Sequence, residues 1–419
     1  MKLGKYSFGL GDRFSHQGVA QLRAIIKTKD ELKIDITPVW NKSNREHTIV
    51  HSKPEDTRIE ADNAVKSLNF KNAYFVDADH ININTVDNFM ESSDFFTLDV
   101  ADYIGKSVSE FEVSKFLKAN NSLIGSLSLP GISKPFVITN DFLQKFASKF
   151  LFACIEASKI YQHIASKKGN DNFITEVSMD EVDEPQTPID LFFILKTLSD
   201  LKVPVQTIAP KFTGRFNKGV DYDGNLVQFE KEFEEDLLVI DYAVANFHLP
   251  TDLKLSVHSG SDKFSIYPIM GNLIRKYNKG IHVKTAGTTW LEEMIGLSLG
   301  TDEGLDLAKA IYSIGYRRKD ELCGPYATVI NIDLNKLPIP EDVTKWNSDE
   351  FSQALQHNLS NPKYNMHFRQ LIHVAYKVAS EYGVIYTDAL VNNKDIIGKC
   401  VTDNIYERHI KRLFSTKQE

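Results

Sequence analysis

Eight short segments made almost wholly of apolar residues recur in the first 290 residues, and stretches with helical periodicity separate most of them. Short apolar segments of this kind are typical of parallel strands that are buried on both faces of a sheet. Eight strands that alternate with helices predict an α/β fold, specifically a closed (β/α)8 TIM-like barrel. The predicted strands are Lys5–Gly11, Ile34–Trp40, Ala73–Val76, Phe95–Val100, Phe173–Val177, Pro204–Ala209, Leu253–Val257 and Ile281–Val283.

Two parts of the chain do not fit this alternation. Residues 103–172 are too long for one crossover and predict a helical insertion after the fourth strand, while residues 316–419 predict a C-terminal extension packed on the barrel. Residues 1–315 would then form the catalytic barrel domain, with Leu305–Ile314 as its eighth helix, and Ala327–Leu337 would be a strand-like stretch of the extension. A doubly wound open sheet is the alternative fold, but no GxGxxG sequence follows a predicted strand, which disfavours it.

The composition excludes several classes of function. The chain has 419 residues and a net charge of −7, and it contains no block of basic residues. Nucleic-acid binding requires clustered Lys and Arg, so we expect no nucleic-acid partner. The three cysteines show no disulfide or zinc-binding spacing, and no apolar run approaches the length of a membrane span. These features predict a cytoplasmic protein without a membrane partner, in which a few local cations could still bind a small anion.

Three residues of types that commonly bind metals occur on alternate predicted strands. His80 follows the third strand, Glu176 lies in the fifth and His258 ends the seventh. Alternate strands of a barrel contribute side chains to the same layer, so these three could converge at the C-terminal mouth. Two imidazoles and a carboxylate suit a divalent cation such as Zn, Mn, Fe, Co or Ni. His282 is a reserve ligand or a substrate-binding residue, and the alternative is that each histidine only hydrogen-bonds to the backbone.

Further ionisable residues follow the predicted strands and could carry proton transfer and anion binding. Asp79 precedes His80, and Glu181 lies in an acidic run that could equally be a solvated loop. Two carboxylates on opposite sides of a substrate could serve as general base and general acid. Cations at strand ends predict an anionic substrate, unless they pair with neighbouring carboxylates. These cations are Arg13, Lys211, Arg215, Lys263 and Lys284.

Several longer motifs lie at the same strand ends. They include Phe8–Phe14 (FGLGDRF), Val76–His80 (VDADH), Thr175–Glu181 (TEVSMDE), Ala209–Gly214 (APKFTG), Ser256–Ser265 (SVHSGSDKFS) and Lys284–Trp290 (KTAGTTW). Together these motifs resemble the tagaturonate epimerase family, and the similarity covers most of the chain. The resemblance implies an isomerase that interconverts D-tagaturonate and D-fructuronate in hexuronate catabolism and depends on a divalent metal cation. It further implies that His80 and His258 are metal ligands, and that Glu176, Asp79 and Glu181 are ligands or acid–base residues.

The implied reaction places demands on the residues. The two sugars are 2-ketoses that differ at C4, which is β to the ketone, so simple enolisation cannot invert this carbon. Retro-aldol cleavage and re-formation of the C3–C4 bond can, with a base at the C4 hydroxyl and a metal as Lewis acid. The alternatives are a metal-dependent ketose isomerase or aldolase acting on a similar acidic sugar, or a non-catalytic sugar-binding protein. The expected roles are metal binding by His80, His258 and Glu176, proton exchange by Asp79 and Glu181, and carboxylate binding by Lys211, Arg215 or Lys263.

Overall fold

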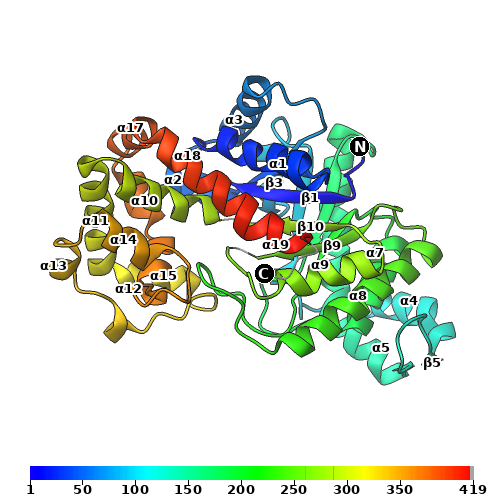
Figure 1. Ribbon diagram of the computed structural model, residues 1–419. Coiled ribbons are helices and arrows are strands. Elements are labelled where there is room, and N and C mark those ends of the chain that lie inside the picture. Colours follow the sequence, from blue (N-terminus) through cyan, green and yellow to red (C-terminus); the bar gives the residue numbers. More distant parts are fainter. Residues whose placement is uncertain (260, 286, 416–419) are drawn as a thin grey trace.

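Eight parallel strands close into a barrel in the computed structural model, which describes residues 1–259, 261–285 and 287–415 (Figure 1). Strand β1 pairs with both β2 and β10, and this double pairing closes the barrel. A strand forms at each of the eight predicted places, so the predicted α/β barrel is confirmed. The strands are β1 (Tyr6–Gly11), β2 (Thr37–Ser43), β3 (Phe75–Ile81), β4 (Phe95–Asp99), β7 (Ile174–Ser178), β8 (Thr207–Ala209), β9 (Lys254–His258) and β10 (Ile281–Lys284).

The barrel interior is apolar at one end and charged at the other. Phe75, Phe95 and Ile174 begin β3, β4 and β7, and they belong to a small buried cluster separate from the main core. Side chains two residues apart on a strand point to the same face. Two residues further along these strands, and equally buried, are Asp77, Thr97 and Glu176.

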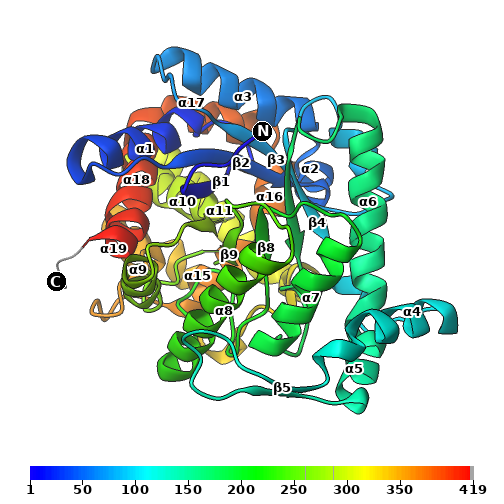
Figure 2. The ribbon, with the colours of Figure 1, turned by 90° about the vertical axis from the view of Figure 1, so that its right-hand side faces the viewer.

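Helices cover the outside of the barrel (Figure 2). Helix α7 begins at a clear start signal, since it has a Thr187–Asp190 capping box and Pro188 at its first position. Strands β3 and β4 are joined only by the short 3₁₀ segment η1 (Val86–Phe89). The helices after the other strands are α1 (Gly18–Leu32), α2 (Asn44–Val50) and α3 (Pro54–Ser67), α6 (Phe152–Lys168), α7 (Pro188–Asp200), α8 (Leu226–Asn246) and α9 (Tyr267–Lys276).

The eighth place in this outer layer is filled by the end of the described chain. The π-helical segment η7 (Asn404–Ile410) and helix α19 (Lys411–Phe414) pack against both α1 and α9. A Cβ at Gly271 of α9 would collide with the Leu413 carbonyl oxygen, so glycine permits this close approach. The prediction that Leu305–Ile314 is the eighth barrel helix is therefore wrong, because that segment lies in α11 (Asp302–Arg317), which packs on α10 and α15 instead.

The insertion after β4 is shorter than the predicted residues 103–172. Helix α5 (Asn140–Phe146) continues through the π-helical segment η4 (Ala147–Leu151) into α6, and α6 packs against β4 and α7 as a barrel helix. The elements that protrude from the barrel in Figure 2 therefore precede α6. They are 3₁₀ turns η2 (Ala101–Tyr103) and η3 (Asn121–Leu123), helix α4 (Glu110–Asn120), α5 and the antiparallel pair β5 (Gly125–Leu127) and β6 (Phe136–Ile138).

The chain after β10 forms a helical lobe beside the barrel (Figure 1). Helix α10 (Thr288–Gly300) packs against α11, α14 and α18 inside this lobe. The predicted strand-like stretch Ala327–Leu337 forms no strand; Val329 and Asn331 bond instead to a barrel loop and to a helix side chain. The other lobe elements are α12 (Lys319–Cys323), η5 (Gly324–Tyr326), η6 (Leu334–Lys336), α13 (Pro340–Val343), α14 (Ser348–Leu355), α15 (Met366–Val374), α16 (Tyr376–Glu381), α17 (Val384–Asn392) and α18 (Lys394–Asp403).

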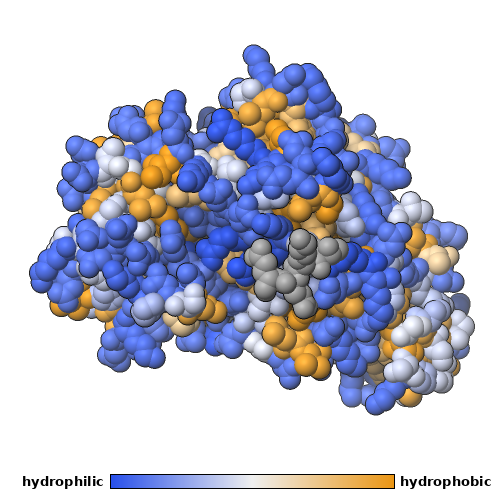
Figure 3. Space-filling model, in the orientation of Figure 1, coloured by the Kyte–Doolittle hydropathy of each residue, from blue (hydrophilic) through white to orange (hydrophobic). Residues whose placement is uncertain are grey.

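The surface is mainly polar on the face drawn in Figure 3, where hydrophobic side chains gather only in small separate groups. Among the helices in the described ranges, none combines the length and the apolar character that crossing a bilayer requires.

Candidate active site

A cavity of about 840 Å³ opens at the C-terminal ends of the strands. Side chains from β3, β9 and β10, from the loops after β1, β2, β4, β7 and β8, and from the C-terminal lobe line it. This end of a barrel is where enzymes of this architecture carry their active sites. The cavity is therefore the candidate active site, and its polar side chains decide its chemistry.

His80 is held in an unusual backbone conformation at the cavity. Its φ is +50°, and the pairing of β3 with β4 changes register between Ala78 and Ile81. A non-glycine residue in this region costs about 1–3 kcal/mol, and such strain gathers at functional sites. A bulge of this kind can redirect a side chain at a strand end. Here the His80 ring lies with its centroid 5.2 Å from that of His258.

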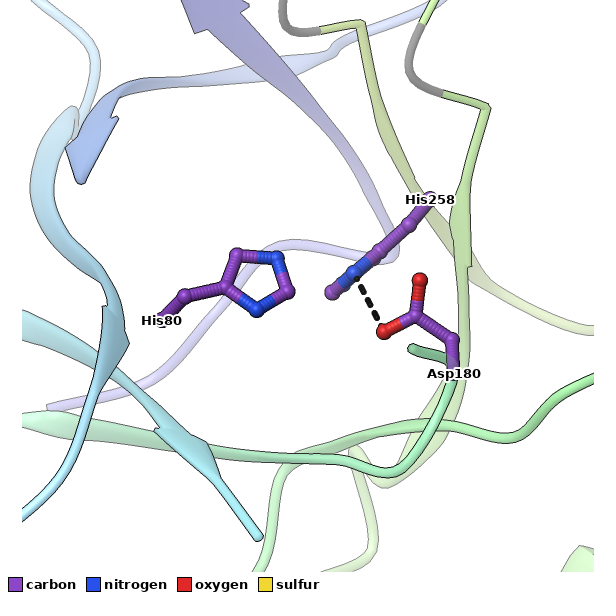
Figure 4. A group of neighbouring side chains, drawn as sticks. All are labelled: His80, Asp180 and His258. Carbon is purple, nitrogen blue, oxygen red and sulfur yellow. Dashed lines mark ion pairs between the residues drawn. The ribbon is translucent and has the colours of Figure 1, made fainter. Parts of the chain in front are cut away.

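Asp180 completes a group with these two histidines, as Figure 4 shows. Its Oδ1 lies 3.1 Å from His258 Nδ1, and one potential ligand atom from each of the three residues lies within 4.8 Å of the others. His258 Nδ1 is thus paired with Asp180, and His80 Nδ1 lies 3.4 Å from Asp99 Oδ2. We call His80, Asp180 and His258 the mouth group. Asp99 and Glu181 form a second such set with His80.

Below the mouth group, Lys284 lies at the centre of a cluster of carboxylates. Its Nζ is 2.7 Å from Asp77 Oδ2, 2.9 Å from Asp79 Oδ1 and 2.7 Å from Glu176 Oε1. It also donates a hydrogen bond to Thr97 Oγ1. We call Lys284, Asp77, Asp79 and Glu176 the Lys284 cluster. It joins β3, β7 and β10 across the interior of the barrel.

Glu176 connects this cluster to the mouth group. Its Oε1 lies 2.9 Å from His258 Nε2, and its Oε2 accepts a 2.7 Å hydrogen bond from Thr207. The side chain is fully buried and does not line the cavity. A carboxylate on one ring nitrogen orients an imidazole and leaves the other nitrogen available to a metal. The geometry therefore favours an orienting role for Glu176 and does not support its expected role as a direct ligand.

The charges of the two groups shift their pKa values strongly. Burial lowers the pKa of His258, but Asp180 and Glu176 outweigh it and raise the value to about 9. Burial likewise opposes the charge of Lys284, but its carboxylate neighbours raise its pKa well above the ordinary value. Burial raises the pKa of Asp77 to about 7 although Lys284 opposes it. The site thus carries an excess of carboxylates that attracts positive charge.

Four of the five cations predicted at strand ends line the cavity: Arg13, Lys211, Arg215 and Lys284. Arg13 donates to Glu46 at 3.0 Å and stacks 4.0 Å from the centre of the Tyr376 ring, so its charge is already paired. Lys211 and Arg215 also line the cavity, and no carboxylate in the described ranges forms a salt bridge with either. Asp79 and Glu181, the predicted acid–base pair, line the same cavity.

The structure gives no support to a substrate contact at Lys263 or His282. Lys263 is fully buried, and its Nζ donates to the Asn217 and Val220 carbonyls at 2.8 and 2.7 Å. His282 is also fully buried, with Nδ1 2.8 Å from Ser7 Oγ, and burial lowers its pKa to about 3. Neither lines the cavity. Both expectations are corrected, because one side chain points into a loop and the other into the barrel interior.

Some cavity residues were not assigned by the sequence. Asp180 directly follows β7, so its place after a strand was the available signal. Arg45 follows β2 by two residues and could have been found in the same way. Lys218 and Tyr326 carried no such signal, because they come from the middle of a loop and from the C-terminal lobe.

Comparison with known proteins agrees with the sequence motifs. The sequence pattern of the tagaturonate epimerase family matches residues 1–413. A tagaturonate/fructuronate epimerase from Thermotoga maritima is 29% identical over 426 residues, which cover 97% of this chain and 79% of the relative. Crystal structures of the fructuronate-tagaturonate epimerase UxaE from Cohnella laeviribosi, one complexed with one glycerol and one native, share the fold with TM-scores of 0.80 and 0.79. Each is 22% identical and covers 99% of this chain and 82% of its own. The family match spans nearly the whole chain, and the protein therefore belongs to the tagaturonate epimerase family.

Proposed function

We propose that this protein interconverts D-tagaturonate and D-fructuronate by inverting C4, with a divalent cation bound at the mouth group. The family and the named activity of its Thermotoga maritima relative support the substrate pair. The observation that carries the metal dependence is the convergence of His80, Asp180 and His258 at the cavity, where one potential ligand atom from each lies within 4.8 Å of the others.

The donor set of the mouth group fits a divalent cation. Two imidazole nitrogens and one carboxylate oxygen suit Zn, Mn, Fe, Co or Ni. The surrounding charge supports the same conclusion, because three buried carboxylates contact one buried lysine and the half-buried Asp180 adds a fourth negative charge beside His258. These carboxylates are Asp77, Asp79, Glu176 and Asp180. When bound, the cation would supply Lewis acidity that stabilises negative charge developing on the ketose oxygens.

The retro-aldol route gives the chain's own carboxylates defined tasks. A base takes the proton of the C4 hydroxyl, the C3–C4 electron pair moves toward the C2 ketone, and C4 becomes an aldehyde. Rotation of this aldehyde and return of the electron pair and proton give the epimer. Asp79 is the candidate base because it lines the cavity and is ionised, since Lys284 keeps its pKa low against the effect of burial. Glu181, on the cavity wall, would supply the proton on the other face.

The substrate carries a carboxylate at C6, and the cavity offers cations for it. Lys211, Arg215 and the residues Arg45 and Lys218 all line the cavity, and none forms a salt bridge with a carboxylate of the described chain. Lys284 cannot take this task, since three carboxylates already surround it.

Incubation of the metal-loaded protein with D-tagaturonate, followed by NMR spectroscopy of the products, tests this function. We expect D-fructuronate as the product. Three-carbon products would identify an aldolase instead, an aldose product would identify an isomerase, and binding without turnover would identify a sugar-binding protein.

A further inference from the structure

Two cations of the cavity share one aromatic ring. The Arg45 guanidinium lies 5.3 Å from the centre of the Tyr326 ring, and Lys218 Nζ lies 5.7 Å from it. Arg45 comes from the start of α2, Lys218 from the loop after β8, and Tyr326 from the C-terminal lobe. All three line the cavity.

The pairing of these cations differs from that of their neighbour Arg13. Arg13 stacks on Tyr376, whose hydroxyl lies 2.9 Å from that of Tyr326, and its charge is neutralised by Glu46. Within residues 1–259, 261–285 and 287–415, neither Arg45 nor Lys218 forms a salt bridge. Two positive charges at one wall of a cavity, neither of them in a salt bridge within the described chain, favour a bound anion.

The backbone around Lys218 is held by side chains of the β9–α9 loop. Lys263 Nζ donates to the carbonyls of Asn217 and Val220 at 2.8 and 2.7 Å. The Gly219 N–H donates to Ser261 Oγ at 2.8 Å. The Lys263 ammonium group is therefore buried, and it holds the backbone of residues 217–220 in place.

The C-terminal lobe holds the same segment from the other side. Gln370 donates to the Lys218 carbonyl at 2.9 Å, and Arg369 donates to the Gly219 carbonyl at 2.6 Å. The Lys218 N–H donates to the Val329 carbonyl at 2.7 Å. Both backbone groups of Lys218 are therefore bound, which fixes the origin of its side chain at the cavity wall.

We propose that Lys218 and Arg45, which both lie against the Tyr326 ring, bind the carboxylate of the sugar acid, and that Gln370 is a positioning residue for Lys218. This inference rests on the proposed function, because it names the group that the two cations would recognise. The Lys218 side chain is half-buried against Tyr326, whereas the Arg215 side chain is exposed, so Lys218 loses less side-chain freedom on binding.

The position of this carboxylate matters in the proposed chemistry. Cleavage between C3 and C4 leaves the C6 carboxylate on the aldehyde fragment, whose C4 carbon must turn before the bond re-forms. Binding at C6 retains this fragment while its other end rotates. The C-terminal lobe would therefore contribute both to substrate affinity and to retention of the intermediate.

The test compares the variant Lys218→Met with the wild-type protein. Methionine keeps much of the side-chain length and removes the charge. We expect the KM for D-tagaturonate to rise about 10-fold to 100-fold, while kcat changes by less than about threefold. Lys115→Met, at an exposed site on the insertion, is the matched control and should leave both constants unchanged. A large KM increase in Lys211→Met or Arg215→Met, with none in Lys218→Met, would overturn the assignment.

The positioning role needs a separate readout. Gln370→Leu should raise KM several-fold in the wild-type background but leave it unchanged in the Lys218→Met background, since the lysine through which it acts is already absent. An equal KM increase in both backgrounds would show that Gln370 has only a structural role, and no increase in either would remove its role altogether.

Calorimetric titration with D-tagaturonate separates failure of this inference from failure of the proposed function. A wild-type protein that binds without epimerising, and a Lys218→Met protein that binds at least 10-fold more weakly, would retain the subsite and reject the epimerase. Epimerisation by both proteins with equal KM and equal affinity would reject the subsite alone. A wild-type protein that does neither would reject both.

Discussion

The described part of the chain holds two clusters of one aspartate and two histidines, and they differ in access to a cavity and in the charge that pairs with the aspartate. In the mouth group, His80, Asp180 and His258 all line the cavity, and the ring nitrogens pair only with carboxylates. In the second cluster, Asp262 is fully buried and both of its oxygens are occupied.

Three side chains pair with the two carboxylate oxygens of Asp262 in the second cluster. Arg369 Nη2 lies 2.6 Å from Oδ2, His357 Nδ1 lies 3.1 Å from Oδ2, and His409 Nε2 lies 3.0 Å from Oδ1. The other His409 nitrogen lies 2.7 Å from the Tyr267 hydroxyl. The Arg369 guanidinium is the permanent cation of this cluster. The contacts of Asp262 with Arg369, His357 and His409 join the β9–α9 loop to the C-terminal lobe. Residue types alone therefore do not distinguish the two clusters, whereas access to a cavity and the absence of a paired arginine make the mouth group the candidate metal site.

The largest expected effect comes from removing one proposed metal ligand of the mouth group. His258→Ala should remove one proposed ligand, lower the bound metal well below one equivalent and reduce epimerase activity about 1,000-fold or more, while the protein remains folded. Metal analysis and steady-state kinetics measure the two effects. His163→Ala, on the exposed face of α6, is the control and should change neither. A fully active, metal-loaded His258→Ala protein would contradict the ligand assignment.

Removing the negative charge of Asp262 from the second cluster should lower the stability of the fold and leave metal binding intact. Asp262→Asn leaves the buried Arg369 guanidinium without its carboxylate, so we expect the free energy of unfolding to fall by about 3–5 kcal/mol. Urea unfolding followed by circular dichroism measures this loss. The folded variant should still bind one metal equivalent. Loss of metal at unchanged stability would reverse the roles of the two clusters.

The third prediction separates a ligand from the residue that orients it. Glu176→Gln should weaken metal affinity about 10-fold to 100-fold, because Glu176 holds His258 from behind. Asp180→Asn should weaken it more, because Asp180 is itself a proposed ligand and lies 3.1 Å from His258 Nδ1. Competition with a chelator gives both affinities. The opposite order would restore Glu176 as the direct ligand.

The smallest expected effect is a change in the pH dependence of stability, and it concerns Glu292, a buried residue of α10 near Arg369 and Asp262. Burial raises its pKa from 4.5 to about 7, although Arg369 opposes the shift. The folded state then holds a proton that the unfolded state has released between these pH values, so stability falls as pH rises through this window. Between pH 5 and pH 8, wild-type stability should fall by about 1–2 kcal/mol more than that of Glu292→Gln. Urea unfolding at the two pH values checks this, and equal pH dependence would contradict it.

The sequence predicted the barrel well, because its information lies in local apolar runs. His80 and His258 could be brought together on paper because alternate strands of a closed barrel share a layer. Glu176 was assigned to the same layer correctly as a strand residue, but its partners Lys284 and Thr207 come from other strands. The sequence does not reveal that these contacts use both of its oxygens.

Contacts between distant segments explain the remaining differences. Lys263 follows a strand end, as the cavity cations do. Its hydrogen bonds to the carbonyls of Asn217 and Val220 become visible only when the position of residues 217–220 in the fold is known. The contribution of residues 316–419 was likewise hidden, because Tyr326 and Gln370 act on barrel loops far away in the sequence. Helix α19 could not be assigned to the outer layer of the barrel from the sequence, because a short basic helix does not indicate which helices it packs against.

The most direct test measures the interconversion of D-tagaturonate and D-fructuronate by NMR spectroscopy before and after removal of divalent metal from the wild-type protein. We expect the chelated protein to lose epimerisation and to recover it when one equivalent of a suitable cation is restored, while His258→Ala recovers nothing. Undiminished epimerisation by a protein shown to be free of metal would contradict the proposed role of the mouth group.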